Sequence, residues 1–527
     1  MIGSEASTIA QTPNAKSARI IAWCVAIALV LFLCAWPLIG GMAAANDDLK
    51  FFRSAEFAGT LWQDVREGWS HHPNFRPLEN IAALLCDEHT LECRGVMLIQ
   101  IGGLLALLAG LAVVVRRLFP SHPIALPMLI IWLTMSPATT ISLWQMDTCS
   151  QTWTAALAAW TGVIVLGGID ATRAGRGVWT HVVILTLLCA TAVNIKEMFY
   201  GWSAGIGFAL IVAIAWLWQR ERPAALRAMW MLVPVAVLPA VHLLVRLKWS
   251  GLGMTVAEAA GDGGEAARYQ INLGSNLLRN AGLSILGLFA DGPLHVVTNV
   301  DAPLPLRLAP LAALVASFII LAAAGLLALL HRQHNLSGSR RARLLAAAAG
   351  LTSVAITLPM GSVSELYGFG ANVASGLIIV ASILALWSPV NIDERTMCRA
   401  IVIPCAAALL AIGLAGVASR AYHFRLTWLY ARELNRIVLE HQRSLPPRAP
   451  GEPRARIIFE RPCYAGQMHS QYIISPVQAI GITDTMHWMN RRDPERPVVF
   501  EPERTVGGLH PNDLVIQCET LPPRRAW

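Results

Sequence analysis

The sequence predicts an all-α polytopic membrane protein with a small α/β domain at its C-terminal end. Of its 527 residues, 55% are hydrophobic and only 14% are charged, and the mean hydropathy is +0.52. A soluble globular protein of ordinary composition carries about 25% charged residues. The composition therefore excludes a purely soluble protein and a disordered chain, and it leaves room for one modest soluble portion.

Eleven segments are long and apolar enough to cross a bilayer, which requires about 20 apolar residues for ~30 Å of hydrocarbon. A further apolar stretch, 271–290, is interrupted by Asn272, Asn276, Arg279 and Asn280, so we expect an interfacial or re-entrant segment, or a half-span. The predicted spans are 20–45, 96–115, 124–142, 151–168, 178–195, 200–218, 228–245, 308–330, 344–360, 374–390 and 400–419.

Basic residues gather in alternate loops between these spans. With the N-terminus inside, Lys16 and Arg19 precede the first span, and every second loop after it is short and rich in arginine. This asymmetry is typical of cytoplasmic loops. The net charge of +8 therefore reflects orientation in a membrane and does not indicate nucleic-acid binding. The loop arginines are Arg116, Arg117, Arg173, Arg176, Arg220, Arg222, Arg227, Arg332, Arg340, Arg341, Arg343, Arg395 and Arg399.

The predicted orientation divides the chain into a cytoplasmic tail, a membrane domain and an outer C-terminal domain. Residues 1–19 contain no cleavable-looking apolar region, so we expect the first span to be a retained anchor. Eleven spans place the C-terminus outside, and the many arginines beside few lysines favour a bacterial source and hence a multi-pass protein of the bacterial inner membrane. The domains are 1–19, 20–420 with outer loops 46–95 and 246–307, and a periplasmic domain at 421–527.

The C-terminal domain has a composition unlike that of the spans, with charges of both signs and many prolines. About 100 residues are enough for a small folded domain. We expect a short helix over 421–442, a proline-rich linker over 445–453, and then an α/β unit. Its strands are predicted from the β-rich runs at 456–460 and 513–518.

Two pairs of cysteines fall in the predicted outer segments. Cys86 and Cys93 share the first outer loop, and Cys463 and Cys518 share the tail. Outside the cytoplasm such pairs can stay oxidised, so we predict two disulfides, Cys86–Cys93 and Cys463–Cys518. Buried free thiols are the alternative. The cysteine spacing does not match a zinc site.

The first span is followed by two adjacent acids, Asp47 and Asp48, at the predicted outer interface. Two close carboxylates repel each other, so one of them can have a raised pKa and accept a proton near neutral pH, or both can hold a divalent ion. A solvated helix end is the alternative. In the same outer loop, His72 and Arg76 belong to a dense polar cluster. The planar guanidinium of Arg76 suits a phosphate, or else it reaches from the interface to water.

Three more helix ends carry polar groups on the predicted outer side. Asp147 follows the third span, and Lys196 and Glu197 lie between the fifth and sixth spans. A lysine and an acid would cost several kcal/mol facing lipid, so they face a cavity or form a structural ion pair. Glu365 and Tyr367 lie between the ninth and tenth spans. An ion-coupled transporter would place acids near the midplane on broken helices. The collection of polar groups at one face favours an enzyme that acts on a lipid-linked substrate in the outer leaflet.

The ordered set of motifs resembles the GT-C superfamily of integral-membrane glycosyltransferases. The matching residues are Asn46-Asp47-Asp48 after the first span and Asn74-Phe75-Arg76-Pro77-Leu78 about 25–30 residues later. Lys196-Glu197 and Ser364-Glu365-Leu366-Tyr367 resemble motifs of the branch with TMTC-like mannosyltransferases and bacterial Gtr-type glucosyltransferases. The resemblance covers roughly residues 20–420. The tail carries no repeat of about 34 residues, unlike the tetratricopeptide arrays of some relatives.

This resemblance implies a GT-C-like fold and an inverting sugar transfer from a polyprenyl-phosphate carrier to a hydroxyl of a cell-surface glycan, a lipid or a protein. It implies Asp47 or Asp48 as the general base, and Arg76 and Lys196 as the cations that bind the donor phosphate. Membrane lipid is an expected partner and nucleic acid is not. No cofactor is certain, and Mg²⁺ or Mn²⁺ is possible. The implied substrate-binding residues are His72, Asp147, Glu197, Glu365 and Tyr367.

Three other functions fit the composition. A transporter or flippase of lipid-linked glycans would be favoured by inverted repeats or by acids buried in mid-span. An O-antigen polymerase or ligase typically has a large arginine-rich outer loop, and 246–307 holds few basic residues. A scaffold without activity would leave the clustered outer carboxylates unexplained.

Overall fold

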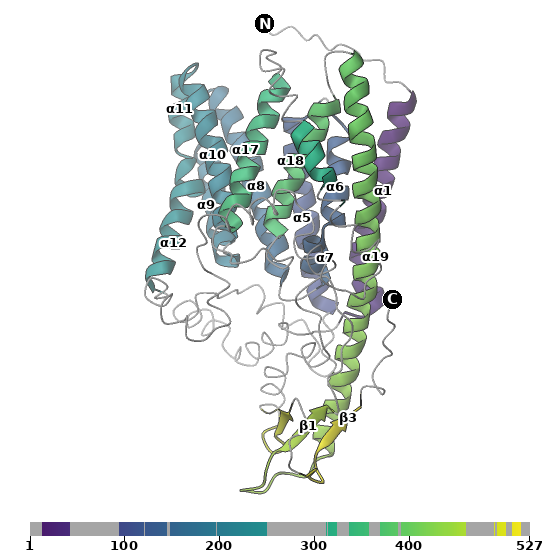
Figure 1. Ribbon diagram of the computed structural model, residues 1–527. Coiled ribbons are helices and arrows are strands. Elements are labelled where there is room, and N and C mark those ends of the chain that lie inside the picture. Colours follow the sequence, from purple (N-terminus) through teal and green to yellow (C-terminus); the bar gives the residue numbers. More distant parts are fainter. Residues whose placement is uncertain are drawn as a thin grey trace.

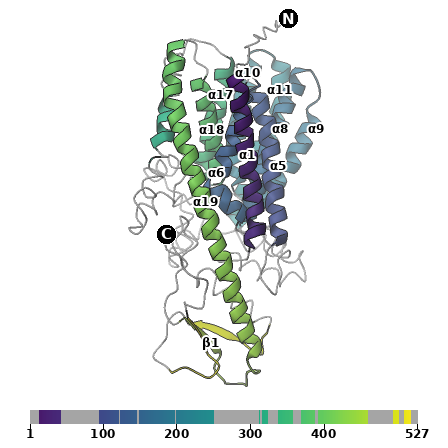
Figure 2. The ribbon, with the colours of Figure 1, turned by 90° about the vertical axis from the view of Figure 1, so that its right-hand side faces the viewer.

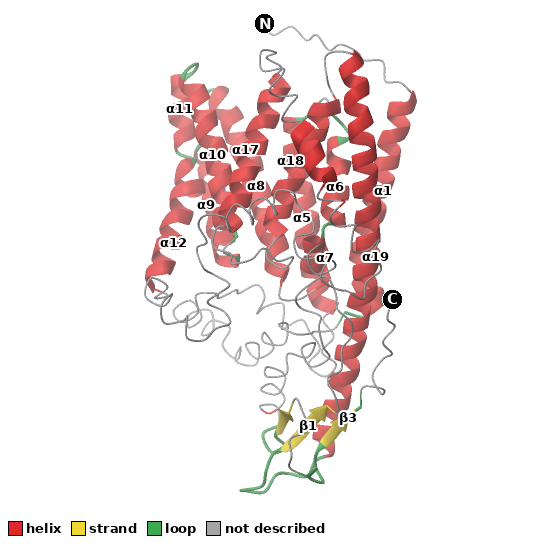
Figure 3. Ribbon diagram, viewed as in Figure 1, coloured by secondary structure: helices red, strands yellow, loops and turns green. Residues whose placement is uncertain are grey.

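The computed structural model shows a bundle of long helices with a small sheet at one end (Figure 1). It describes residues 13–42, 94–120, 122–144, 148–196, 198–249, 312, 315–323, 337–357, 369–387, 392–459, 490, 493–501 and 508–517. Figure 3 distinguishes the helices of the bundle from the strands.

The helices of the bundle coincide with the predicted spans. By length and composition, six of the described helices can cross a membrane, or seven when a bent pair is counted as one span, and three further apolar helices are shorter. The chain is a polytopic α-helical membrane protein, as predicted. Of the predicted span 308–330, only 312 and 315–323 are described. The helices are α1 (Pro13–Gly40), α5 (Arg94–Leu118), α6 (Ala125–Met135), α7 (Pro137–Trp144), α8 (Cys149–Arg173), α9 (Trp179–Ile195), α10 (Phe199–Trp218), α11 (Arg222–Met229), a π-helical turn (Val233–Val237), α12 (Leu238–Trp249), α17 (Ser337–Thr357), α18 (Phe369–Trp387) and α19 (Ile392–Ser444).

The predicted third span is not one helix. It consists of α6 and α7, which meet at an angle of 67°. Pro137 has no backbone N–H, and its ring disfavours a helical conformation for the residue before it. Ser136 accordingly adopts extended dihedral angles, with φ −65° and ψ 133°. A hydropathy window does not detect the break because apolar residues continue on both sides of it.

The last span and the helix predicted over 421–442 are one element. α19 runs without interruption for 53 residues, from Ile392 to Ser444. The expectation of two separate helices is therefore wrong. The physical reason is that the polar residues after 420 are good helix formers and no glycine or proline separates them from the apolar part. α19 extends beyond the other helices and carries the sheet at its far end (Figure 2).

The helices approach one another closely where glycines face a neighbouring helix. A Cβ on Gly413 of α19 would lie 2.5 Å from the sulfur of Met135, the last residue of α6. A Cβ on Gly103 of α5 would lie 2.7 Å from the Thr152 hydroxyl of α8. Small residues allow helix backbones to pack closely in membranes, where lipid gives little hydrophobic drive for association.

The three strands form a parallel sheet in the order β2-β1-β3. Ile457 of β1 is paired with Phe500 of β2 and with Leu514 of β3. The bounds are β1 (Ala455–Phe459), β2 (Val498–Glu501) and β3 (Leu514–Ile516). β1 overlaps the predicted run 456–460 and begins one residue before it, and β3 falls within the predicted run 513–518.

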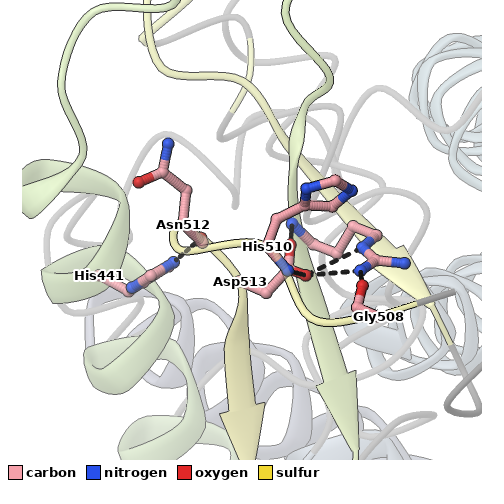
Figure 4. Close-up of polar contacts among 6 residues, drawn as sticks. His441, Gly508, His510, Asn512 and Asp513 are labelled. Carbon is pink, nitrogen blue, oxygen red and sulfur yellow. Dashed lines mark hydrogen bonds and ion pairs between the residues drawn. The ribbon is translucent and has the colours of Figure 1, made fainter.

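The sheet is fixed to the end of α19 by polar contacts. The Gln442 amide donates to the carbonyl of Arg496, and Arg496 Nε donates to the carbonyl of Leu445, at 2.9 and 2.8 Å. Figure 4 shows His441 bonded to the carbonyl of Asn512 and the contacts around Asp513. Asp513, 1% exposed, accepts a 2.6 Å bond from Arg456 Nη2 and a 2.7 Å bond from the His510 N–H. The tail is therefore attached to the bundle by a rigid helix and a network of hydrogen bonds.

Arginines mark the opposite end of the bundle. Arg117 of α5 pairs with Asp170 of α8 at 3.5 Å, and Arg227 of α11 donates to the carbonyl of Thr172 in α8 at 2.8 Å. These contacts place the C-terminal ends of α5 and α8 beside α11, at the end away from the sheet (Figure 1). Below, this is the arginine end and the other is the sheet end.

Candidate functional site

One residue of the predicted site, Lys196, lies within the part of the chain that the structure describes. Its side chain is 2% exposed, at the sheet end, where α9 turns into α10. The other predicted site residues lie outside the described residues, as do the four cysteines of the predicted disulfides. They are Asp47, Asp48, His72, Arg76, Asp147, Glu197, Glu365, Tyr367, Cys86, Cys93, Cys463 and Cys518.

Lys196 occupies the first position after α9. Its backbone is extended, with φ −158° and ψ 142°, while its N–H still donates to the carbonyl of Ala192 at 3.3 Å. Its own carbonyl accepts a bond from the Phe199 N–H at 3.2 Å, which starts the next helix. The turn is thus fixed on both sides. A charged lysine is almost never this buried unless it is paired, so its ammonium group is a strong candidate for function.

The turn at Lys196 packs against the ends of α17 and α18. A Cβ on Gly370 in the first turn of α18 would lie 2.9 Å from Met198 and from Ile356 of α17, and 3.1 Å from the Trp202 indole nitrogen. A side chain at this position would have to displace the ends of the Met198 and Ile356 side chains. The end of α17 and the first turn of α18 therefore lie beside the turn that contains Lys196.

An aromatic cluster joins the C-terminal ends of α1 and α7 to the middle of α19. Trp144, the last residue of α7, is fully buried and donates its indole N–H to the carbonyl of Leu33 in α1 at 2.9 Å. Its ring meets Phe424 and Trp428 of α19 edge-on, with centroids 5.5 and 6.3 Å apart. Trp36 of α1 donates to the carbonyl of Ala421 at 2.9 Å.

This cluster brings together the points from which three of the predicted acids depart. Met42, the last described residue after α1, belongs to the same core as Trp144. Asp47 and Asp48 follow Met42 by five and six residues, and Asp147 follows Trp144 by three. Thr148, on the other side of Asp147, donates its hydroxyl to the carbonyl of Ile141 at 3.0 Å. The chain on both sides of Asp147 is therefore fixed.

Polar side chains are buried along the first turns of α8, which follows Asp147. α8 packs against α7, α9 and α18. It thereby connects the aromatic cluster to the turn at Lys196. The buried polar residues of this part of α8 are Thr148, Ser150, Gln151, Thr152 and Thr154.

The sequence did not predict a structural or functional role for two arginines of α19. Arg420, 2% exposed, donates from Nη2 to the carbonyl of Met135 at 2.7 Å and from Nε to the Thr140 hydroxyl at 3.2 Å. It thus supplies a donor to a carbonyl at the broken end of α6. Arg432 donates to the carbonyl of Gly41 at 2.7 Å, where α1 ends with φ +68°. A cation at a helix C-terminus also interacts favourably with the helix dipole.

A sequence signal for both arginines exists. Arg420, Phe424, Trp428 and Arg432 follow one another at intervals of four, so on a helix they lie on one face. The pattern crosses residue 420, the predicted boundary between the membrane domain and the C-terminal domain.

No group of three or more His, Cys, Asp and Glu side chains suited to a metal ion occurs among the residues that the structure describes. Among the described cysteines, Cys24, Cys34, Cys189 and Cys405 are free thiols.

No family model matches the chain, and no curated protein matches it. Two solved structures are similar in fold. ArnT from Cupriavidus metallidurans, bound to undecaprenyl phosphate, has 14% identity and a TM-score of 0.40 over 92% of this chain and 90% of its own. The archaeal oligosaccharyltransferase AglB from Archaeoglobus fulgidus, bound to an inhibitory peptide and a dolichol-phosphate, has 10% identity and a TM-score of 0.41 over 93% of this chain and 65% of its own.

Identities and scores of this size describe a likeness in the arrangement of helices. The chemistry is therefore argued from the residues of this chain.

Proposed function

We propose that this protein is a membrane glycosyltransferase that moves a sugar from a polyprenyl-phosphate carrier to an acceptor hydroxyl at the sheet end of the bundle. The observation that carries the proposal is the burial of Lys196 at the end where the segments bearing Asp47, Asp48 and Asp147 leave a common aromatic cluster. A buried cation at the end of the bundle where these acidic segments begin suits a reaction in which an anionic phosphate leaves and a hydroxyl loses a proton.

The proposed reaction is an inverting displacement. Asp47 or Asp48 takes the proton of the acceptor hydroxyl, whose oxygen attacks the anomeric carbon of the sugar. The bond between that carbon and the carrier phosphate breaks, and the polyprenyl phosphate leaves with the electron pair. Lys196 and Arg76 bind the phosphate oxygens, where negative charge increases in the transition state. His72, Asp147, Glu197, Glu365 and Tyr367 are the proposed contacts to the substrates.

The burial of Lys196 gives it more effect than an exposed lysine would have. The attraction between unit charges at 4 Å rises from about 1 kcal/mol in water to about 4 kcal/mol near a protein surface, because less solvent screens it. An ammonium that is already held in such a place needs no reorganisation when the phosphate becomes more negative. The turn contacts of Ala192 and Phe199 fix the lysine backbone before the substrate binds.

The proposed location is the inner membrane of a bacterium, with the arginine end in the cytoplasm and the sheet in the periplasm. The positions of the arginines support this orientation, because positive loops stay on the cytoplasmic side. Polyprenyl-linked sugars would then reach the site from the outer leaflet. The acceptor, a glycan, a lipid or a protein, would meet it from the periplasm.

The test uses the full-length protein in proteoliposomes with undecaprenyl-phosphate hexoses as donors. Analysis of lipid-linked sugars that accumulate in a deletion strain selects the donor to use. The double substitution Asp47→Asn with Asp48→Asn is expected to abolish transfer while the protein still inserts. Asp170→Asn, at the arginine end, is the matched control and is expected to keep the parental rate. Transfer by the double variant at the parental rate would show that the catalytic assignment is wrong.

A bound Mg²⁺ or Mn²⁺ at these acids stays a prediction, and chelation tests it. A rate that falls on addition of EDTA and returns with Mg²⁺ or Mn²⁺ supports a metal ion at the site. An unchanged rate contradicts it.

A flippase for lipid-linked glycans is the second candidate, and the break between α6 and α7 favours it. Transporters often build their substrate sites on interrupted spans. Against it, neither α6 nor α7 contains an acidic residue. A vesicle assay of lipid-linked glycan movement without an acceptor distinguishes the two functions, because a glycosyltransferase does not need to move its donor across the bilayer.

A further inference from the structure

The arginine end carries more positive charge than its acids balance. Five arginines lie at the ends of α8, α10 and α11, and we refer to Arg173, Arg176, Arg220, Arg222 and Arg227 as the arginine belt. Asp170 and Glu221 are the acids beside the belt, and Asp170 pairs with Arg117 of α5. Arg173 approaches Glu221 only to 4.0 Å, with both side chains more than 40% exposed. Exposed pairs of this kind contribute little, so the belt keeps its positive charge.

Two guanidinium groups of the belt share one aromatic ring. The guanidinium carbon of Arg220 lies 4.6 Å from the centroid of the Trp216 ring, and that of Arg173 lies 5.6 Å from it. The indole therefore holds two like charges near each other, an arrangement that an anion between them would stabilise. Arg176 and Arg222 have no side-chain partner among the residues that the structure describes, so their donors are available to a ligand.

Arg227 adds a donor that is already in place. Its Nη2 is bonded to the carbonyl of Thr172, which fixes the guanidinium, while its Nε is buried and has no partner among the described residues. A buried donor without a partner costs free energy, so a ligand that accepts this bond gains more than one that meets a solvated donor.

Large apolar side chains surround the belt and remain exposed. The ring of Trp179 in α9 lies tilted by 40° against that of Trp230, at a centroid distance of 5.3 Å, and the two residues are 60% and 52% exposed. Trp218 and Leu226 are exposed by 45% and 54%. Tryptophan at this level of a span is typical of the membrane interface. A free phosphate ion would gain nothing from contact with these apolar side chains, whereas a phospholipid would cover them with its acyl chains.

We propose that the arginine belt binds the phosphate head group of an anionic phospholipid of the inner leaflet. Arg173 and Arg220, held beside Trp216, would bind the phosphate oxygens directly. Arg176 and Arg222 would add positive charge at the edge of the site. The acyl chains would lie along the exposed tryptophans and leucines of α9, α10 and α11. This lipid site lies at the end away from Lys196, so its test does not depend on the proposed sugar transfer.

The test measures lipid retention by the full-length protein with native mass spectrometry. The protein is placed in nanodiscs of phosphatidylcholine with and without cardiolipin, and the bound cardiolipin is counted. The triple substitution Arg173→Gln, Arg220→Gln and Arg222→Gln is expected to weaken cardiolipin binding about 100-fold, because each arginine near an anionic surface contributes roughly fivefold. A matched triple substitution, Arg425→Gln, Arg436→Gln and Arg443→Gln on exposed parts of α19, is expected to leave it unchanged.

A second variant keeps the test valid if the first one inserts in the wrong orientation. Trp216→Leu leaves every arginine and the loop charge unchanged but removes the shared ring, and it is expected to weaken cardiolipin binding severalfold. Equal cardiolipin retention by parent, triple variant and Trp216→Leu would overturn the proposal. Displacement of cardiolipin by inorganic phosphate at constant ionic strength would also overturn it, since the site would then recognise a free phosphate.

Discussion

The two ends of the helix bundle hold positive charge in opposite ways. At the arginine end, the side chains of Arg173 and Arg220 are exposed. Both lie against the Trp216 ring, and Arg173 also approaches Glu221 at 4.0 Å. At the sheet end, Lys196 and Arg420 are each only 2% exposed, and Arg420 bonds directly to a backbone carbonyl and a hydroxyl. Exposed charges act through solvent and the membrane surface, whereas buried ones act through fixed contacts in a medium that screens them poorly. Single substitutions should therefore have large effects at the sheet end and small effects elsewhere.

The largest effect is expected for Lys196→Met on sugar transfer. Loss of a preorganised group that stabilises transition-state charge typically lowers the rate by about 10²–10³. Methionine keeps the length and apolar stem of the side chain, so the protein is expected to insert and fold. Initial rates with the undecaprenyl-phosphate donor measure the effect, and Lys16→Met at the opposite end is the control. A Lys196→Met rate equal to that of the control would remove the distinction between the two ends.

Trp144→Ala is expected to give the largest loss of stability, about 3–5 kcal/mol, because it empties a fully buried site among α1, α7 and α19. Trp144→Phe keeps most of the volume and loses the bond to Leu33, so a loss of about 1 kcal/mol is expected. Unfolding in detergent, followed by tryptophan-independent far-UV circular dichroism, measures both. Similar losses for the two variants would mean that the hydrogen bond, and not packing, stabilises the cluster.

Arg420→Met is expected to cost about 1–3 kcal/mol, because the carbonyl of Met135 and the hydroxyl of Thr140 lose their buried donor. Arg420→Lys keeps the charge but not the fork that reaches both acceptors, so an intermediate loss is expected. The exposed Arg425, five residues further along the same helix, serves as the control. A loss for Arg425→Met as large as that for Arg420→Met would contradict the contrast between buried and exposed arginines.

Local properties of the sequence predicted much of the fold. Hydropathy and length located the apolar helices that the structure describes. The loop arginines were predicted to lie on one side, and the contacts among α5, α8 and α11 bring their arginine-bearing ends together at one end of the bundle. The bend at Pro137 depends on more than a local pattern. Proline also occurs inside α1 at Pro37 and inside α19 at Pro404, yet both helices continue. Whether a proline breaks a span depends on what can satisfy the freed carbonyls, and here Arg420, 285 residues away in sequence, donates to the carbonyl of Met135.

The candidate site shows the same limit. Lys196 was identified because a lysine between two apolar spans conflicts with its surroundings, and that conflict is visible in the sequence. When the last span is predicted to end near 420, Arg420 and Arg432 lie outside the apolar segment. Nothing in the sequence then marks them as unusual. Their function as donors to α6 and α1 follows from which helices lie opposite each other, and that is a tertiary property.

A smaller and pH-dependent effect is expected in the tail sheet. Burial alone would raise the pKa of Asp513, but hydrogen bonds from Arg456 and from the backbone N–H groups of His510 and Arg456 outweigh it and lower the pKa below its usual 3.8. The folded state therefore favours the ionised form. The stability that this adds is present above about pH 4, near the unfolded pKa, and is lost as the pH falls through the lowered value.

Protection factors from hydrogen exchange of β1 and β3 measure this effect and correct for the intrinsic pH dependence of exchange. They are expected to fall below pH 4 in the parent. Asp513→Asn has no such titration, so its protection is expected to be lower at neutral pH and nearly flat across the range. Acid sensitivity that persists in Asp513→Asn would assign the effect to another group.

The smallest effect is expected for Arg436→Ala on the exposed side of α19. Arg436 bonds to Glu433 at 2.6 Å and to Glu440 at 2.9 Å, one turn away on either side. The bond from Arg436 lowers the pKa of Glu433, so its contribution would be present above about pH 4.5 and lost below it. Solvent screens the attraction in such a pair, and the side chains lose conformational freedom in forming it. The net contribution of the pair to the free energy of unfolding is therefore close to zero. The unfolding midpoint of Arg436→Ala is expected to match that of the parent at neutral pH. A clear drop would show that α19 beyond the bundle depends on surface charge, and the distinction between buried and exposed cations would then hold for the bundle alone.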